Sequence, residues 1–331
     1  MRRGLLTFLS ALAVMAAGPI LLFLGAFLLT WKEYPVPATV SNNPALPRLI
    51  IDQVTLHSQS FGDRQAPVLL VLHDGPGQDY SQLLPLKALA DRYRVVFYDQ
   101  RGSGLSARVP SEKLTIQESL KELERVIEQV SPERPVSLFG HGWGGMLAAA
   151  YAGKTPEKID QLILAEPGFL NTDMANRILP ALSRTSAGFI WNTTLAWVRS
   201  LHIHGPDSDA PADYVYAQIY FQPRYHCTGQ QPQNLPLQRS GFRAWKTITQ
   251  STFSKDNKIA IDFVQGLSKL KEPVLFLVSE CNSLTGKDFQ TRQMRLFPKA
   301  QMALVKGSGH AFFLDKPAES LKHIRSFLSK K

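Results

Sequence analysis

Cysteine is scarce in this sequence. Only Cys227 and Cys281 occur among the 331 residues. Two cysteines are too few for a disulfide framework, and no Cys-x-x-Cys pair or similar spacing marks a metal site. The sequence therefore predicts no metal and no cofactor, and it leaves open whether the two cysteines pair.

Charged residues are also few, and none of them gather into runs. They make up 19% of the chain, and although the formal net charge is +10, lysines and arginines are scattered among acidic residues. A basic arm for nucleic acid is therefore lacking, and we expect no nucleic-acid partner. Hydrophobic residues make up 44%, which is enough for one large core, so we expect one globular domain.

A long apolar segment opens the chain. No residue from Gly4 to Trp31 is charged, and the stretch is long enough to cross ~30 Å of hydrocarbon. Arg2 and Arg3 precede it, so the positive-inside bias places the N-terminus in the cytoplasm. Residues 1–32 are therefore predicted to anchor the protein to a membrane by one span, with the domain on the periplasmic or extracytoplasmic side. A cleaved signal peptide is the alternative, although its apolar core is usually shorter.

The remainder of the chain divides into a short linker and an α/β domain. Residues 33–48 are rich in proline and predict a semi-rigid stalk. Over residues 49–331, short β-branched runs alternate with helical patterns, which indicates a mostly parallel, doubly wound sheet. The alternation stops between about 169 and 265, where we expect a helical cap. The clearest strands are 68–73, 95–99, 136–139, 162–165, 274–279 and 302–305.

Three loops follow predicted strands, at the edge where an open parallel sheet places its ligand site. They are His73-Asp74-Gly75-Pro76-Gly77, Asp99-Gln100-Arg101-Gly102-Ser103-Gly104-Leu105-Ser106 and Gly140-His141-Gly142-Trp143-Gly144-Gly145. In this order they resemble loops of the α/β-hydrolase superfamily, and specifically of its proline iminopeptidase-like branch. The resemblance runs from about Leu49 to the C-terminus and implies an α/β-hydrolase fold.

The resemblance implies a nucleophilic serine at position 142, in the turn between a strand and a helix, where this chain has Gly142. Without a side chain there, covalent acyl transfer lacks its attacking group. The sequence offers no evident stand-in, since Cys281 belongs to another loop. Glycine would also relieve the backbone strain of such a turn.

The other catalytic positions are only partly retained. The resemblance assigns the catalytic histidine to His310, but it places Asn282 where the family has an aspartate. An amide cannot carry the charge that stabilises an imidazolium. Glu166, at the end of the strand before the cap, is the candidate surrogate acid, and Glu280 is a second.

The resemblance also points to an oxyanion site. Gly75 permits the tight turn of the first loop, and Trp143 would supply a backbone N–H group. Asp74 stands where the resembled loop has glycine, so it would bring negative charge close to any developing oxyanion.

Two functions are compatible with these residues. The sequence favours a membrane-anchored pseudohydrolase that binds an unidentified small ligand or protein partner through the former active-site pocket, because two triad positions differ together. The alternative is a weak or atypical hydrolase, ester or aminopeptidase-like, that uses His310 with water or a surrogate acid. A third interpretation is an altered residue at position 142 in an otherwise active serine hydrolase.

Overall fold

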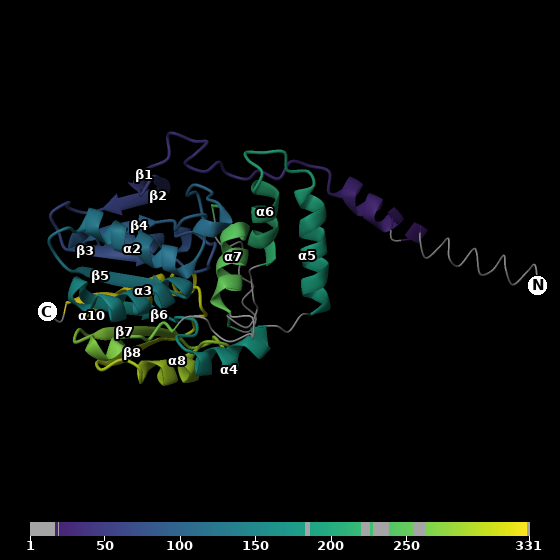
Figure 1. The fold of residues 1–331 in the computed structure, drawn as a ribbon. Coiled ribbons are helices and arrows are strands. Elements are labelled where there is room, and N and C mark those ends of the chain that lie inside the picture. Colours follow the sequence, from purple (N-terminus) through teal and green to yellow (C-terminus); the bar gives the residue numbers. More distant parts are fainter. Residues whose placement is uncertain are drawn as a thin grey trace, which may run out of the picture.

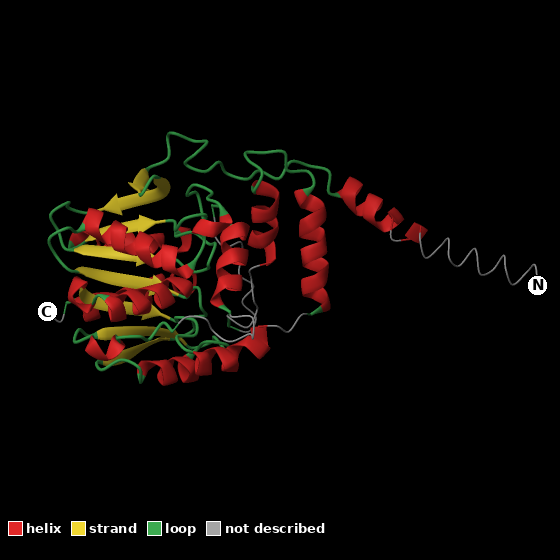
Figure 2. Ribbon diagram, in the orientation of Figure 1, coloured by secondary structure: helices red, strands yellow, loops and turns green. Residues whose placement is uncertain are grey.

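An eight-stranded sheet forms the centre of the computed structural model, which describes residues 17–18, 20–182, 186–219, 226–227, 238–253 and 262–329 (Figures 1 and 2). The strand order is β1-β2-β4-β3-β5-β6-β7-β8. The bounds are β1 (Arg48–Ile51), β2 (Val54–Phe61), β3 (Val68–Leu72), β4 (Arg94–Tyr98), β5 (Val136–His141), β6 (Ile159–Ala165), β7 (Val274–Ser279) and β8 (Ala300–Val305).

All strand pairs from β4 to β8 in this order are parallel. The two antiparallel pairs are β1 with β2 and β2 with β4. The prediction of a mostly parallel sheet is thereby confirmed. β1 and β2 are not among the clearest predicted strands. In β2 the polar residues His57, Ser58, Gln59 and Ser60 dilute the apolar signal that marks the buried strands.

Helices cover both faces of the sheet, and β3 shows why. Leu70 belongs to the core under α2 (Ile116–Val130) and α3 (Trp143–Lys154), whereas its neighbour Leu69 belongs to the core on the other face. Strands buried on both faces read as continuous apolar runs, as β3 does. The remaining helices around the sheet are η1 (Ser81–Asp91), η2 (Ser111–Lys113), η3 (Pro156–Lys158), η5 (Leu267–Lys269), α8 (Lys287–Met294), α9 (Phe312–Asp315) and α10 (Pro317–Leu328).

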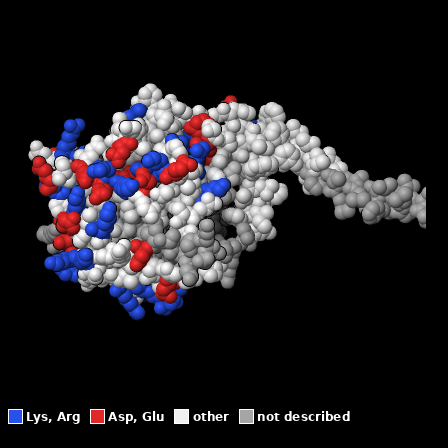
Figure 3. Space-filling view, viewed as in Figure 1, with Lys and Arg blue, Asp and Glu red and all other residues white. Residues whose placement is uncertain are grey.

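Between β6 and β7 the chain forms a helical layer beside the sheet (Figure 1). Its helices are α4 (Thr172–Leu182), α5 (Ala187–Ser200), α6 (Ala210–Ile219) and α7 (Phe242–Thr252). A disulfide joins Cys227 of this insertion to Cys281, which follows β7. Charged side chains gather over the sheet and its helices, whereas the region of α5 and α6 is almost uncharged in the view of Figure 3.

The N-terminal segment differs from the prediction of a membrane span. Residues 20–29 are helical, and a helix of that length rises ~15 Å, about half of the hydrocarbon thickness. Among the residues that the structure describes, no helix is both long and apolar enough to cross a membrane. Residues 1–16 lie outside the described part. The prediction of a single-pass membrane protein with an extracytoplasmic domain is therefore wrong.

Residues 33–47 run along the domain and contact both of its layers (Figure 1). The backbone N–H group of Val40 donates to the carbonyl oxygen of Leu105 at 2.8 Å, and the Val40 side chain is buried. The carbonyl oxygen of Pro37 accepts a hydrogen bond from Arg239, which lies between α6 and α7. This stretch thus ties the N-terminal helix to the core and to the inserted helices.

Candidate active site

Gly142 forms the sharp turn between β5 and α3. Its φ of 50° and ψ of −112° belong to a region that glycine adopts readily and other residues adopt only with strain. A Cβ atom added to Gly142 would overlap the Oδ1 atom of Asp74. The carboxylate of Asp74 therefore fills the space in which a side chain of residue 142 would begin.

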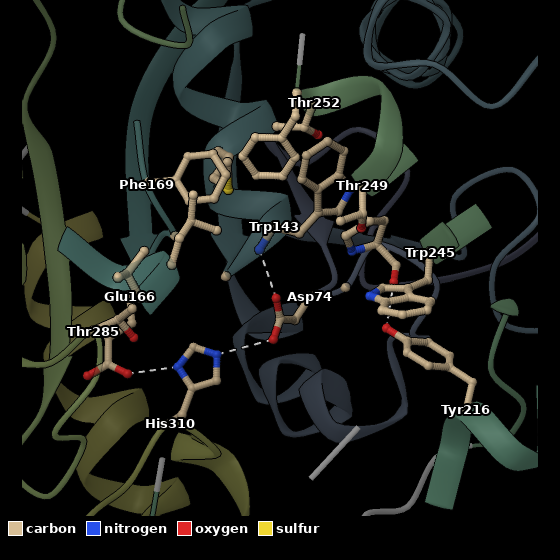
Figure 4. Close-up of a pocket in the computed structure, with 18 of the residues that line it drawn as sticks. Asp74, Trp143, Glu166, Phe169, Tyr216, Trp245, Thr249, Thr252, Thr285 and His310 are labelled. Carbon is tan, nitrogen blue, oxygen red and sulfur yellow. Dashed lines mark hydrogen bonds and ion pairs between the residues drawn. The ribbon is translucent and has the colours of Figure 1, made fainter. Parts of the chain in front are cut away.

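Asp74 reaches this place from the loop after β3. Its Oδ1 atom accepts a hydrogen bond of 2.8 Å from the backbone N–H of Trp143, and its Oδ2 atom lies 3.1 Å from Nε2 of His310 (Figure 4). Trp143 is the first residue of α3, so the positive end of the helix dipole also favours the carboxylate. The predicted oxyanion donor and the predicted histidine thus both contact Asp74.

Glu166 lies on the opposite side of the same imidazole, in the turn after β6. Its Oε2 atom is 2.7 Å from Nδ1 of His310. The Oε1 atom accepts hydrogen bonds from the backbone N–H of Ser279 at 2.8 Å and from the Ser279 hydroxyl at 2.5 Å. The Asn282 amide donates to Oε2 at 2.6 Å. Asn282 therefore orients Glu166, and Glu166 is the carboxylate that contacts the histidine.

The second candidate acid lies elsewhere. Glu280 is exposed, and its carboxylate accepts a hydrogen bond from the backbone N–H of Gly307. The structure therefore brings together Asp74, His310 and Glu166 in one row, in which both carboxylates are buried, and leaves Glu280 outside it.

The two carboxylates determine the charge of the histidine. Burial by itself would lower the pKa of His310, but the hydrogen bonds and negative charges of Asp74 and Glu166 outweigh burial and raise it to about 10. Burial would likewise raise the pKa of Asp74, but the hydrogen bond and positive charge of His310 hold it well below its usual value. At neutral pH the site therefore holds an imidazolium between two carboxylates.

Neighbouring side chains fix this arrangement from behind. The His141 ring stacks on that of His310 with centroids 4.3 Å apart, and its Nε2 atom lies 2.9 Å from the His310 carbonyl oxygen. Burial, followed by the charge of His310, lowers the pKa of His141 to about 3, so this ring stays neutral and donates from Nε2. His73 donates to the carbonyl oxygen of Asp74, which holds the loop that carries the carboxylate.

Among the described residues, Asp74, His141 and His310 form the one group with potential metal-ligand atoms within 4.8 Å of one another. In this arrangement the Asp74 carboxylate and Nε2 of His310 already bond to each other. The proton on Nε2 of His310 holds the imidazole and the carboxylate together. Hydrogen bonds therefore explain the geometry of the site.

The row of charged groups faces a cavity of about 520 Å³. Its walls are mostly apolar, and the cap supplies many of them, with Tyr216 and Trp245 on the side of Asp74 away from His310 (Figure 4). The apolar lining residues include Met146, Phe169, Ile178, Leu179, Phe189, Ile219 and Phe253. A cavity of this size and lining suits a small apolar ligand that presents one reactive group to Asp74 and His310.

The position of the Asp74 carboxylate could not be predicted from the sequence. The sequence marked this residue as a departure in the oxyanion loop, and it marked Gly142 as a missing nucleophile. Gly142, which has no side chain, and Asp74, whose carboxylate comes from the neighbouring loop, form a complementary pair in space. That pairing was the signal, since both loops follow adjacent strands of a parallel sheet.

Comparisons with known proteins agree with the fold. A family model described as "alpha/beta hydrolase fold" matches residues 67–317. A proline iminopeptidase of Lactobacillus helveticus is 27% identical over 291 residues, which cover 81% of this chain and 92% of that protein. A proline iminopeptidase-related protein of Thermus thermophilus superimposes with a TM-score of 0.60 at 18% identity, over 86% of this chain and 96% of its own. A thermophilic esterase of Thermogutta terrifontis superimposes with a TM-score of 0.62 at 20% identity, over 86% of this chain and 98% of its own.

Proposed function

The chain belongs to the alpha/beta hydrolase fold family, and on that premise we propose that it is an atypical hydrolase whose attacking group is the carboxylate of Asp74. One observation carries the proposal. The carboxylate lies where the side chain of residue 142 would begin, between the His310 imidazole and the Trp143 N–H group. His310 and Glu166 complete a row of nucleophile, base and orienting acid, which is the arrangement that covalent catalysis requires.

The route of a serine hydrolase is closed in this site. Gly142 offers no hydroxyl, and the Trp143 N–H group, which would hold the oxyanion of a substrate carbonyl, already donates to Asp74. A carboxylate that attacks an ester or amide carbonyl would form an anhydride, which is more reactive than the bond it replaces. The activity of the proline iminopeptidase relative is therefore not carried over to this chain.

A carboxylate can instead attack a saturated carbon. Oδ2 of Asp74 forms the new C–O bond, and the leaving group departs with the electron pair of the bond that breaks. The product is an alkyl ester on Asp74. Water then gives a proton to neutral His310 and attacks Cγ of the ester, and the oxyanion forms on Oδ1, where the Trp143 N–H group already donates. Collapse releases the alcohol and restores the carboxylate.

The electrostatics of the row suit this two-step reaction. The raised pKa of His310 depends on the negative charges of Asp74 and Glu166. Esterification removes the charge of Asp74, so the pKa of His310 falls in the intermediate and the imidazole can release its proton. The first step thereby converts His310 from an imidazolium into the general base that the second step needs.

Alkylation of the protein tests this proposal without a known substrate. The variant His310→Gln keeps a polar side chain but cannot activate water, so an ester on Asp74 should persist. After incubation with 1-bromohexane at pH 9, we expect one hexyl group on the peptide that contains Asp74, by mass spectrometry. The double variant with Asp74→Asn is the control and should remain unmodified. Absence of the hexyl group from Asp74 would contradict the proposal.

A pseudohydrolase is the second candidate function, and a specific observation favours it. Asp74 and His310 neutralise each other at rest, and Asp74 fills the place of the oxyanion. The apolar cavity would then bind a ligand without reaction. Two negative results would support this function: no alkylation of Asp74, and no labelling of the native protein by a fluorophosphonate. The cavity should then still bind apolar compounds.

A further inference from the structure

We propose that the disulfide between Cys227 and Cys281 is a redox switch that positions the carboxylate of Glu166 against His310. A dithiol that opens the bond should slow hydrolysis of the ester on Asp74 and leave formation of that ester unchanged. For the reaction step this inference rests on the proposed function, because it names a control over the second step at the same site. The two cysteines are the only ones in the chain, so no other thiol of the protein competes for either of them.

Cys281 lies within the segment that fixes Glu166. Two residues before it, Ser279 donates to Glu166 from both its backbone N–H group and its hydroxyl. The residue after it, Asn282, donates from its side-chain amide to Oε2 of Glu166, the oxygen that contacts His310. These donors lie within the four consecutive residues 279–282, and the disulfide joins that segment to the cap.

The loop that carries His310 also holds this segment. The backbone N–H group of Cys281 donates to the carbonyl oxygen of Ser308 at 3.0 Å, and the Glu280 carboxylate accepts a hydrogen bond of 2.8 Å from the backbone N–H of Gly307. Both contacts are independent of the sulfur bond, so the segment keeps its fold when that bond opens. It loses the covalent link to the cap, which changes the position of its donors to Glu166 and leaves the domain folded.

The other end of the disulfide also lies near the charged row. His226 precedes Cys227 in the cap, and burial, followed by the positive charge of His310, lowers the pKa of His226 to about 4. The charge of His310 therefore reaches the cap residue beside the disulfide. One cysteine thus adjoins a residue near His310, and the other adjoins Asn282, which orients Glu166.

The sulfur bond is accessible to small reductants, because Cys227 and Cys281 are both partly exposed. A thiolate of a dithiol attacks one sulfur, and the other cysteine leaves with the electron pair of the S–S bond. The second thiol of the reductant then attacks the mixed disulfide and releases the first cysteine. The dithiol supplies two electrons and two protons and becomes a cyclic disulfide, while the protein gains two thiols. Oxidised glutathione, a small disulfide, reverses the exchange.

The effect falls on the second step because Glu166 acts through His310. A less closely held Glu166 stabilises the imidazolium less, so the pKa of His310 should fall from about 10. Hydrolysis of the Asp74 ester needs His310 as a correctly oriented base, and loss of such a supporting contact costs roughly 10- to 100-fold. Attack by Asp74 on the substrate transfers no proton to or from His310.

The position of Glu166 can be measured without a substrate. Nδ1 of His310 lies 2.7 Å from Glu166, so the proton between them should give a far downfield ¹H NMR signal in ¹⁵N-labelled protein. We expect dithiothreitol to shift this signal upfield and to lower the pH at which the ring titrates by about 1, a tenfold change in acidity. Oxidised glutathione should restore both.

A second buried histidine–carboxylate pair is the internal control. Nδ1 of His57 lies 2.8 Å from the carboxylate of Asp99, and β2, which carries His57, is several strands away from β7 in the sheet. Its signal should not respond to dithiothreitol. The double variant Cys227→Ser with Cys281→Ser should show the His310 signal of the reduced protein, with or without the reductant.

The same double variant tests the reaction step. Native protein or variant, in excess, is mixed with 1-bromohexane, and the hexyl group on the peptide that contains Asp74 is followed by mass spectrometry. The ester should form at the same rate in both proteins and should disappear roughly tenfold more slowly in the variant. Serine is used at both positions because the bromide would alkylate free thiols.

The outcomes separate this inference from the proposed function. An unchanged His310 signal after reduction, with two thiols counted by iodoacetamide, would overturn the positioning role, and so would loss of the His57 signal as well. A bond that resists dithiothreitol in the folded protein would overturn the switch. Equal slowing of ester formation and hydrolysis would overturn the assignment to the second step. If 1-bromohexane never modifies Asp74, the proposed function and that assignment fail, whereas the NMR signals still decide whether the disulfide positions Glu166.

Discussion

The two carboxylates on either side of His310 are held in different ways. Glu166 accepts hydrogen bonds from Ser279 and Asn282 on both of its oxygens, so the scaffold fixes it. Asp74 lies above Gly142, which has no side chain, and faces the cavity. An acid that is fixed from behind is suited to orient the imidazole, and one that faces the cavity is suited to meet the substrate. This difference assigns the orienting role to Glu166 and the attacking role to Asp74.

The largest effect should come from neutralising the fixed carboxylate. In Glu166→Gln the amide cannot stabilise the imidazolium and favours the wrong tautomer of His310, a change that costs a serine protease roughly 10⁴-fold in turnover. We expect a loss of roughly 10³- to 10⁴-fold in release of the alkyl group from Asp74. Attack by Asp74 on 1-bromohexane should slow far less, and stopped-flow mass analysis separates the two steps. Equal slowing of both would show that the carboxylates do not differ in role.

The stability of the protein should depend on pH through the contacts of His310 with Asp74 and Glu166. The pKa of His310 is raised from 6.5 to about 10, so its stabilisation is fully present below pH 6.5 and is lost as the pH rises through about 10. We expect the free energy of unfolding in urea to fall by a few kcal/mol over that range. Asp74→Asn and Glu166→Gln should each reduce the fall, and His310→Gln should abolish it. An unchanged fall in His310→Gln would assign the pH dependence to other groups.

A smaller effect on the reaction is expected from substitution of Gly142, which has no side chain. A Cβ atom on Gly142 would overlap Asp74, so Gly142→Ala should push the carboxylate away from Trp143 and His310. We expect alkylation of Asp74 to slow by about 10²-fold, because small displacements of a reacting group have effects of that size. Gly153→Ala, near the far end of the helix that follows Gly142, tests general damage, because its Cβ atom would meet the backbone of Gln265 and should destabilise the protein without moving Asp74. Faster alkylation in Gly142→Ala would contradict the placement of Asp74.

The smallest effect should come from the support of Glu166. Removal of one hydroxyl in Ser279→Ala leaves the backbone N–H of residue 279 and the Asn282 amide in place. We expect a loss of roughly tenfold in hydrolysis of the Asp74 ester, at the lower end of the effects seen for supporting hydrogen bonds. The rate of ester formation should stay unchanged. A loss as large as that of Glu166→Gln would mean that the fixed carboxylate depends on this single contact.

The parallel core was predictable because its strands are buried on both faces and therefore read as unbroken apolar runs, as in β3. Glu166 was predicted as a candidate from its place at a strand end, and Asp74 and His310 from the resemblance of their loops; the structure places the three side chains in contact. The approach of Asp74 to Gly142 could not be predicted. It depends on the path of a loop in which Gly75 and Gly77 have positive φ, and no local pattern encodes where that path ends.

Two other features lay beyond the sequence for physical reasons. An apolar N-terminal stretch predicts a membrane span by its length, but only residues 20–29 of the described part form a continuous helix there. Pairing of Cys227 with Cys281 depends on the approach of the cap to the loop after β7. Composition determines neither the length of the N-terminal helix nor the approach of the cap to the loop after β7.

The most direct test of the attack by Asp74 is the fate of isotopic oxygen in one turnover. Native protein in excess is mixed with 1-bromohexane in H₂¹⁸O. The ¹⁸O content of the alcohol and of the peptide that contains Asp74 is then measured by mass spectrometry. Attack by Asp74 predicts unlabelled hexanol, whose oxygen comes from Asp74, and one ¹⁸O atom in the Asp74 carboxylate. Labelled hexanol with an unlabelled Asp74 would show that water attacks the substrate directly, and would contradict attack by Asp74.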